Sequence, residues 1–192
     1  MERPLHLAVI VGSTREGRFG PTVTQWFTSL VEERRDYDLD VIDLAELDLP
    51  AVFPRQPSPA VAAYRARLER ADAFVVVTPE YNHGYPAPLK QAIDLAHEQW
   101  QAKPVAFVSY GGMSGGLRAV EQLRQVFAEL HTTTVRDVVS LHNPWSQFDD
   151  DGTLPASTGA PAATRTMLDA LAWWGRALRA AREASPYAQR SA

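Results

Sequence analysis

The chain has 192 residues, a size typical of a single domain with a sizeable core. It is 45% hydrophobic and 22% charged with a net charge of -4, so its bulk charge gives no reason to expect nucleic-acid binding. It contains no cysteine, which excludes disulfides, thiolate nucleophiles, iron–sulfur clusters and Cys-ligated zinc, and we predict no metal site. No segment has the length of a membrane span and no signal peptide is evident, so we expect a cytoplasmic protein.

Short apolar runs alternate with amphipathic patterns along the whole chain. The runs predict strands at residues 5–11, 38–44, 73–77, 104–109 and 133–141. The 3.6-residue patterns predict helices at residues 23–31, 60–70, 89–100, 117–130 and 167–178. We expect one domain over residues 1–184 and a disordered tail at 185–192.

Five alternating strand–helix units indicate an α/β fold, a doubly wound parallel sheet with helices on both faces. The strand at 38–44 is shorter and more polar than the others, which places it at an edge of the sheet. In such folds ligands bind at the carboxyl ends of the strands. Three loops with unusual sequences leave those ends.

The first loop, GSTREGRFGPT, joins the first strand to the first helix. Small residues and hydroxyls at a helix N-terminus suit a phosphate, because backbone N–H groups and the helix dipole favour an anion. Arg15 and Arg18 add positive charge and bidentate donors. The hydroxyl donors are Ser13, Thr14 and Thr22.

The first loop has the G-x-x-x-x-G spacing of a nucleotide-binding Walker A loop. However, Arg18 stands in place of its lysine and Phe19 in place of its magnesium-binding hydroxyl, which argues against ATP or GTP hydrolysis. The alternative to an anion site is a solvated loop whose charges serve solubility.

The second loop, TPEYNHGYPAP, follows the third strand and is stiffened by prolines at both ends. A stiff loop loses little entropy when its backbone groups bind the edge of a planar ring, and its tyrosines add flat surfaces with polar tips. Glu80 and Lys90 are expected to form an ion pair. The alternative is a loop that is rigid for stability alone.

The third loop, SYGGMSGG, follows the fourth strand, and its glycines permit close approach of a flat ligand. It also satisfies the G-x-S-x-G pattern of serine hydrolases, which makes Ser114 a candidate nucleophile with Asp137 and His142 after it. Because these two residues are five positions apart on or just after one strand, an extended chain points them to opposite faces.

Together the three loops resemble those of the NADPH-dependent FMN reductase family of flavodoxin-like proteins, which also holds quinone, azo-dye and chromate reductases. The motifs that carry the resemblance are GSTREGR, TPEYNHGYPAPLKQAID and SYGGMSGG. The resemblance extends to about the last helix, and it implies a five-stranded sheet of order 2-1-3-4-5 between two helical layers. The segment at 142–159 matches no motif of the family.

The resemblance also implies which residues bind FMN. On the first loop, those near the phosphate would be Ser13, Arg15, Arg18, Phe19, Gly20 and Thr22. On the second loop, those along the isoalloxazine would be Pro79, Glu80, Tyr81 and Asn82. On the third loop, those closing the other side of the ring would be Tyr110, Gly111, Gly112 and Gly115. Backbone N–H groups near Ser114 and Gly115 would offset negative charge on the reduced ring.

The implied activity is that of an NAD(P)H-dependent reductase. Hydride would pass from NADPH or NADH to FMN, and electrons would then pass to free flavin, a quinone, an azo compound, chromate or a similar small molecule. No side chain needs to act as an acid, base or nucleophile. Family members are commonly homodimers or homotetramers, so Leu89, Ile93 and Trp100 would serve an interface as well as the core.

Two alternatives belong to other functional classes. The first is an FMN-binding electron carrier or sensor without NAD(P)H activity of its own, although the charge of -4 and the two arginines of the first loop argue against it. The second is a serine hydrolase that uses Ser114, which leaves the first two loops without a role.

Overall fold

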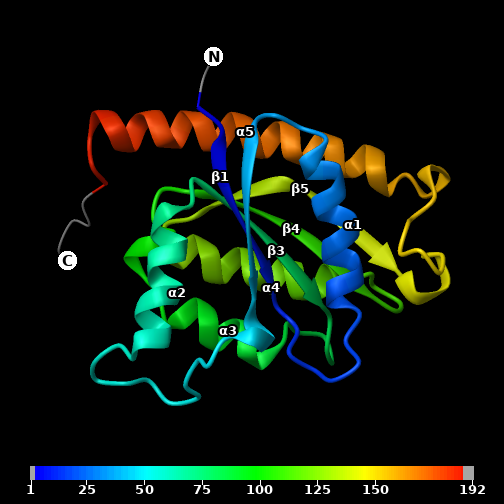
Figure 1. The fold of residues 1–192 in the computed structure, drawn as a ribbon, viewed down its shortest axis with the longest axis horizontal. Helices are drawn as coiled ribbons and strands as arrows, with labels where there is room; N and C mark the ends of the chain where they lie inside the picture. The colour runs from blue at the N-terminus through cyan, green and yellow to red at the C-terminus, as the bar shows by residue number, and fades with distance from the viewer. Residues whose placement is uncertain (1–2, 188–192) are drawn as a thin grey trace.

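The computed structural model describes residues 3–187, and within them five parallel strands form one sheet of order β2-β1-β3-β4-β5 (Figure 1). The strands are β1 (Leu5–Val11), β2 (Tyr37–Asp43), β3 (Ala73–Pro79), β4 (Pro104–Gly111) and β5 (Thr133–His142). The expected strand order and the edge position of the second strand are both confirmed.

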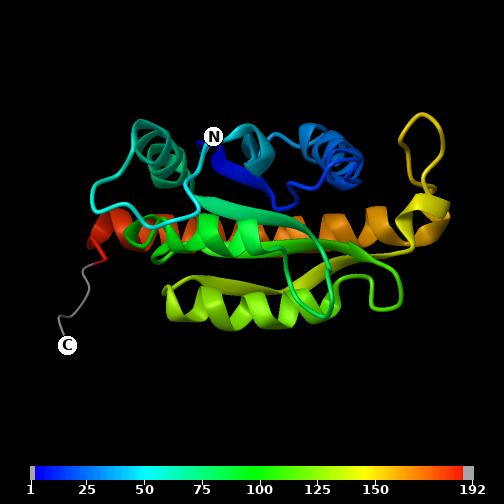
Figure 2. The ribbon, with the colours of Figure 1, turned by 90° about the horizontal axis from the view of Figure 1, so that it is seen from below.

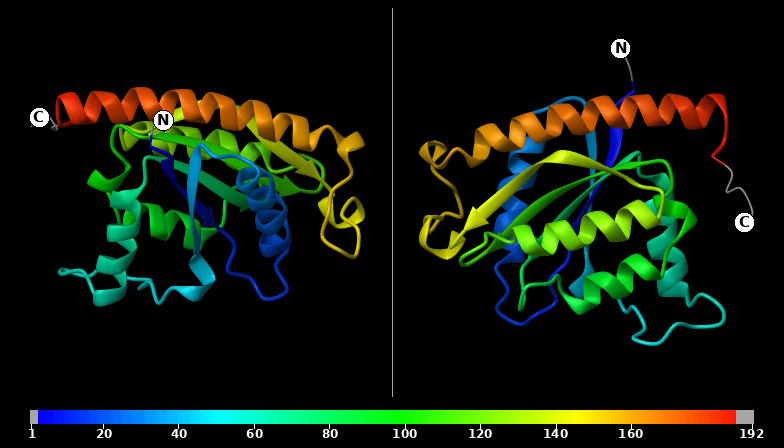
Figure 3. Two further views of the ribbon diagram at one scale, coloured as in Figure 1. Left: turned by 45° about the horizontal axis from the view of Figure 1, so that its top comes forward. Right: turned by 180° about the vertical axis from the view of Figure 1, so that it is seen from behind.

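Helices cover both faces of the sheet, as the alternating units predict (Figure 3). They are α1 (Gly20–Glu32), α2 (Pro59–Arg70), α3 (Ala87–Asp94), α4 (Leu117–Glu129) and α5 (Ala160–Ala184). α1 and α5 pack on one face, and α2, α3 and α4 pack on the other.

The central strands are continuously apolar because each face of the sheet has its own core. On β1, Leu7 and Val9 pack with α1 and α5, whereas Ala8 and Ile10 pack with the three helices of the opposite face. Successive side chains of a strand point to opposite faces, so both sets must be apolar when both faces are covered.

The helix predicted at 89–100 is shorter than expected. α3 ends at Asp94, and a separate 3₁₀ turn follows at Glu98–Trp100. The buried indole of Trp100 donates to the carbonyl of Ile93 over 3.0 Å, so this side chain satisfies the end of α3 instead of extending it. Because Leu89, Ile93 and Trp100 are fully buried in the core, they offer nothing to an interface between subunits.

The two ends of the described chain lie near the amino edge of the sheet. Of the tail expected at 185–192, residues 188–192 fall outside the described part, while the hydroxyl of Tyr187 lies 2.6 Å from Nδ1 of His131. Between residues 3 and 187, no helix combines the length and the apolar character that a membrane span needs.

Candidate functional site

The loops after β1, β3 and β4 meet at the carboxyl edge of the sheet (Figures 1 and 2). Strand pairing places them there, because β1 pairs with β3 and β3 pairs with β4, all in parallel. The sequence-predicted residues of the three loops are therefore brought together at one edge.

The first loop leaves its backbone donors free. Gly12 still donates to Val77, as a continuation of the strand, but within the described chain none of the N–H groups of residues 13–17 donates to another backbone group. α1 then begins after Phe19 with no side-chain cap and no acidic residue in its first turn. Free N–H groups at an uncapped helix start are a favourable environment for an anion.

The two arginines of the first loop have different partners. Arg18 donates to both carboxylate oxygens of Asp43 over 2.5 and 2.7 Å, and to the carbonyl of Ser13 over 2.7 Å. Hydrogen bonding to Asp43 raises the pKa of Arg18 above its usual value. Arg15 is exposed, and within residues 3–187 its guanidinium forms no ion pair or hydrogen bond, although its carbonyl accepts from the N–H of Arg18 over 3.2 Å.

The second loop ends in a tight turn closed by two backbone hydrogen bonds. Tyr81 N–H donates to the Gly84 carbonyl over 2.9 Å, and Gly84 N–H donates to the Tyr81 carbonyl over 3.0 Å. Neither bond uses the backbone groups of Asn82 and His83, which occupy the exposed tip. The hydroxyl of Tyr81 lies 2.7 Å from Oγ of buried Ser13, so the second loop is joined to the first.

The predicted ion pair between Glu80 and Lys90 is wrong. Lys90 pairs with Asp94, one turn further along α3, over 2.5 Å. Glu80 turns instead toward the third loop and α4, where its carboxylate lies 2.5 Å from a guanidinium nitrogen of Arg118 and accepts from the hydroxyl of Ser114 over 2.5 Å. Burial alone would raise the pKa of Glu80, but the hydrogen bonds and charge of these partners hold it below its usual value.

The third loop depends on two glycines in the left-handed region. Gly115 and Gly116 have φ of +60° and +87°. A Cβ on Gly115 would lie 2.3 Å from Oγ of Ser140, and one on Gly116 would lie 2.7 Å from Cβ of Ser109. Of the N–H groups expected here as donors to a reduced ring, that of Gly115 is occupied, because it donates to the Gly112 carbonyl, whereas that of Ser114 donates to no other group of residues 3–187.

Tyr110, at the base of the third loop, points beneath the first one. Its ring is buried, and its hydroxyl would lie 3.0 Å from a Cβ on Gly20 at the start of α1. Burial raises the pKa of this phenol, with a further contribution from Tyr81. The side chain therefore supports the first loop from below.

The segment at 142–159 contacts both the third and the first loop. Asn143 N–H donates to the carbonyl of Gly111 over 2.7 Å. Phe148 packs edge-on against Phe19 and Trp26, with ring centroids 5.4 and 6.0 Å apart. The segment thus forms a wall on the α1 side of the site, a role that its sequence did not indicate.

Comparison with known proteins identifies the family. A family model for NADPH-dependent FMN reductases matches residues 5–146. The chain belongs to this family. It is therefore an oxidoreductase of the FMN reductase family, whose cofactors are FMN and NAD(P)H.

Similar proteins in other organisms carry matching names. An NAD(P)H-dependent FMN reductase of Schizosaccharomyces pombe is 35% identical over 131 residues, which are 62% of this chain and 64% of the relative. A probable NADPH:quinone oxidoreductase of Oryza sativa is 33% identical over 166 residues, which are 79% of this chain and 80% of the relative.

Solved structures support the flavodoxin-like fold. The flavoenzyme NAD(P)H:acceptor oxidoreductase from Paracoccus denitrificans matches with a TM-score of 0.76 and 23% identity, over 90% of this chain and 97% of that one. A flavodoxin from the domain Archaea matches with a TM-score of 0.56 and 16% identity, over 88% of this chain and 97% of that one.

The geometry of this FMN reductase family member does not form a hydrolase triad. The hydroxyl of Ser114 donates to Glu80 and not to a histidine. Nε2 of His142 lies 3.4 Å from Oγ of Ser140, and Asp137 lies beside Arg136. The G-x-S-x-G pattern arises here because the glycines shape the loop.

Sequence reasoning missed the residues that hold the loops of this family member in place. Arg118 and Gln122 reach the second loop from α4, and Asp43 reaches the first loop from the end of β2. A signal was present for Asp43, because the carboxyl ends of parallel strands share one edge. For Arg118 and Gln122, the signal was their i, i+4 spacing directly after the third loop.

Proposed function

We propose that this protein takes hydride from NADPH or NADH onto FMN and delivers the electrons to a small-molecule acceptor such as free flavin, a quinone, an azo compound or chromate. The observation that carries the proposal is the first loop, where free N–H groups, an uncapped helix start and an unpaired arginine converge. These are the features that a flavin phosphate requires.

The phosphate is assigned to the backbone of residues 13–17, the first turn of α1 with Gly20 and Thr22, and the side chain of Arg15. Arg18 has a different role in this proposal. Because Asp43 already neutralises its charge, Arg18 braces the loop and leaves the phosphate charge to Arg15.

The isoalloxazine edge is assigned to the second loop, from Pro79 to Asn82, and to the backbone of Gly111 and Gly112 in the third loop. Asn82 at the exposed tip has free backbone groups for such an edge. A Cβ on Gly112 would meet only Asn143 within 4 Å, so the loop surface there is open to a flat ligand. Gly115 and the side chains of Glu80 and Tyr110 support these surfaces from within.

FMN, when bound, supplies the hydride-accepting chemistry. The protein's own residues bind the phosphate, orient the ring edge between the two loops and leave one side of the ring accessible to substrates. None of the three loops needs a proton-transferring side chain for this function.

We further propose a cytoplasmic location and a homodimer or homotetramer. Support for assembly comes from exposed apolar side chains between β2 and α2, where Val52 is 78% and Phe53 is 56% exposed. Large exposed apolar side chains in a cluster are typical of interaction surfaces.

The test of the proposed site compares FMN with riboflavin, which lacks the phosphate. Arg15→Ala should raise the dissociation constant of FMN about tenfold and leave that of riboflavin unchanged, since one charge-assisted hydrogen bond contributes roughly 1.5–3 kcal/mol. Fluorescence titration of each flavin provides both constants. Arg35→Ala, an exposed arginine beyond the other end of α1, is the matched control and should change neither.

An unchanged dissociation constant for FMN in Arg15→Ala would contradict the assignment of the phosphate to the first loop. Failure of the wild-type protein to bind or reduce FMN would contradict the proposed function itself.

A further inference from the structure

The turn from Tyr81 to Gly84 has a backbone conformation that its own residues disfavour. Asn82 and His83 both have positive φ, 50° and 69°. Asparagine and histidine enter this region more readily than most other residues, but it still costs each of them about 1 kcal/mol. Two backbone hydrogen bonds close the turn, yet its tip projects from the protein and needs support from elsewhere.

That support comes from one face of α4. Nε2 of Gln122 donates to the carbonyl of His83 over 2.8 Å, and a guanidinium nitrogen of Arg118 lies 2.5 Å from Nε2 of His83. Arg118 and Gln122 are four residues apart, so they lie on the same side of the helix. Figure 2 shows the second loop beside the start of α4.

Arg118 also holds the residue that precedes the turn. Its Nη2 lies 2.5 Å from Oε1 of Glu80, and its backbone N–H donates to Oε2 over 3.2 Å. The carboxylate is buried, with 6% of the side chain exposed, and it accepts from Ser114 as well. Arg118 thus links the base of the second loop to the tip of its turn, and Glu80 connects both to Ser114 near the end of the third loop.

These contacts are not what attaches α4 to the sheet. The buried face of the helix is formed by Ala119, Val120, Leu123 and Phe127. Arg118 and Gln122 lie outside that face, and the side chain of Arg118 is 39% exposed. Their polar groups are therefore directed at the loops, and the core is complete without them.

We propose that Arg118 and Gln122 are positioning residues that hold the second loop in the shape that receives the flavin ring before the flavin arrives. The inference rests on the proposed function, because it takes the second loop as the contact for the ring edge. A loop that is ordered in advance loses less entropy on binding. Loss of Arg118 or Gln122 should therefore weaken binding of the flavin ring and leave the contribution of the phosphate unchanged.

The test measures dissociation constants for FMN and riboflavin in Arg118→Ala and Gln122→Ala, together with the melting temperature of each flavin-free variant. Arg118→Ala should weaken binding of both flavins by the same factor, about tenfold, and Gln122→Ala by about threefold. Gln125→Ala is the matched control, an exposed glutamine on the next turn of α4, and should leave both constants unchanged.

The pattern across the two flavins separates the possible outcomes. Unchanged flavin affinity in both Arg118→Ala and Gln122→Ala, with wild-type binding intact, would overturn the inference and leave the proposed function standing. A loss for FMN alone would also overturn it, because that loss belongs to the phosphate. If the wild-type protein binds neither flavin, the proposed function fails and the inference fails with it. Should Arg118→Ala fold poorly, the exposed Gln122→Ala decides the question.

Discussion

Arg15 and Arg18 lie three residues apart in the first loop, yet only one of them is available to a ligand. Asp43 at the end of β2 accepts two hydrogen bonds from Arg18, whereas Arg15 remains exposed. A carboxylate that neutralises a guanidinium removes most of its attraction for a phosphate. From the sequence alone the two arginines are equivalent candidates for a phosphate contact. Only the position of β2, which brings Asp43 to Arg18, shows which of them is available.

Lys103 is a buried cation at the amino edge of the sheet, the edge opposite the three loops. Its Nζ donates to the carbonyls of Leu68 and Glu69 over 2.9 Å each, at the end of α2. Burial lowers the pKa of this amine to about 8, and the positive charge of Arg182 adds to the effect. The side chain thus caps the carboxyl end of α2, where the Leu68 carbonyl also accepts from the N–H of Ala71.

The lowered pKa predicts how stability changes at alkaline pH. Because the amine titrates near 8 in the folded protein and has an ordinary value of 10.5, the unfolded state holds more protons between these values. The free energy of unfolding should therefore rise with pH across this window, relative to a Lys103→Met variant. Denaturant unfolding at several pH values measures the difference.

Lysine carbon NMR offers a direct check, since Lys90 and Lys103 are the two lysines of the chain. One signal should titrate at about 8 and persist in Lys90→Arg. Titration of that signal at its ordinary value would contradict the assignment of a buried, desolvated amine.

At the scale of elements, the third loop is the least tolerant connection. Gly115 and Gly159 both have positive φ, +60° and +76°, but only Gly115 is surrounded by side chains. The pair therefore separates backbone strain from steric conflict.

Gly159→Ala should lower the free energy of unfolding by about 1 kcal/mol, the cost of a left-handed alanine. Gly115→Ala should lower it by about 2 kcal/mol or more and weaken flavin binding, because its Cβ meets Ser140 and His142. Equal effects of the two substitutions, measured by thermal unfolding, would show that the third loop can rearrange.

The elements themselves were largely predictable. β1 coincides with the predicted run at residues 5–11, because a central parallel strand needs apolar side chains on both faces. Trp100 misled the helix prediction, since it fits a 3.6-residue pattern but packs from a separate turn. Pairs such as Glu80 with Arg118 join distant segments, and no local pattern specifies which charge meets which.

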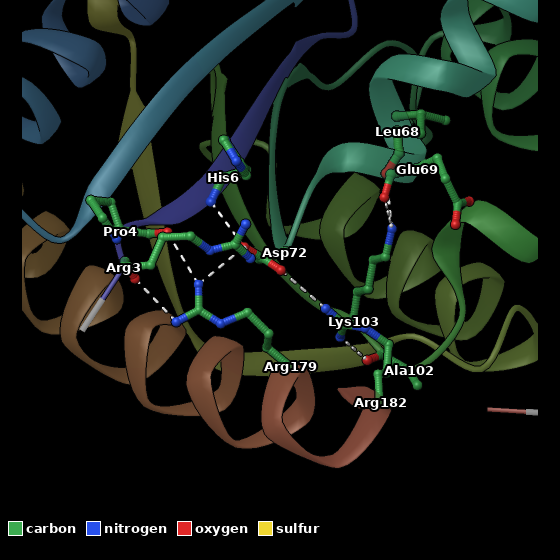
Figure 4. A network of polar contacts seen from close by, with 10 residues as sticks. All are labelled: Arg3, Pro4, His6, Leu68, Glu69, Asp72, Ala102, Lys103, Arg179 and Arg182. Atoms are coloured by element: carbon green, nitrogen blue, oxygen red, sulfur yellow. Dashed lines mark hydrogen bonds and ion pairs between the residues drawn. The ribbon is translucent and has the colours of Figure 1, made fainter. Parts of the chain in front are cut away.

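For the whole molecule, one buried carboxylate connects β1 with the last turns of α5, near the two ends of the described chain (Figure 4). Asp72, directly before β3, accepts from the backbone N–H of His6 over 3.1 Å, from Arg179 over 3.3 Å and from Arg182 over 3.2 Å. Arg179 also donates to the carbonyls of Pro4 and Arg3. The amino edge of the sheet is thus fixed by an ionic network.

Asp72→Asn should lower the free energy of unfolding by about 3 kcal/mol, because it leaves the buried guanidinium of Arg179 without its counter-charge. Asp169→Asn is the matched control. It removes an exposed partner of Arg34 and should change stability by less than about 1 kcal/mol. Flavin affinity should be the same in both folded variants, since the ionic network lies at the amino edge and the proposed flavin site at the carboxyl edge. A loss of affinity in Asp72→Asn alone would contradict the independence of the two edges.

The two edges of the sheet therefore have different tasks. At the amino edge Arg179 and Arg182 are paired with Asp72, whereas within residues 3–187 the carboxyl edge presents free N–H groups and the unpaired guanidinium of Arg15. Polar groups that lack a hydrogen-bond partner within a rigid protein edge are expected where a ligand supplies that partner.

The central claim, that this edge serves an NAD(P)H-dependent reduction of FMN, is tested most directly by an anaerobic visible spectrum. The purified protein is mixed with FMN and titrated with NADPH and, separately, with NADH. Bleaching of the flavin bands in proportion to the added nicotinamide, and only in the presence of the protein, is the predicted result. Flavin bands that neither nucleotide bleaches would contradict the reductase and favour an FMN-binding carrier or sensor.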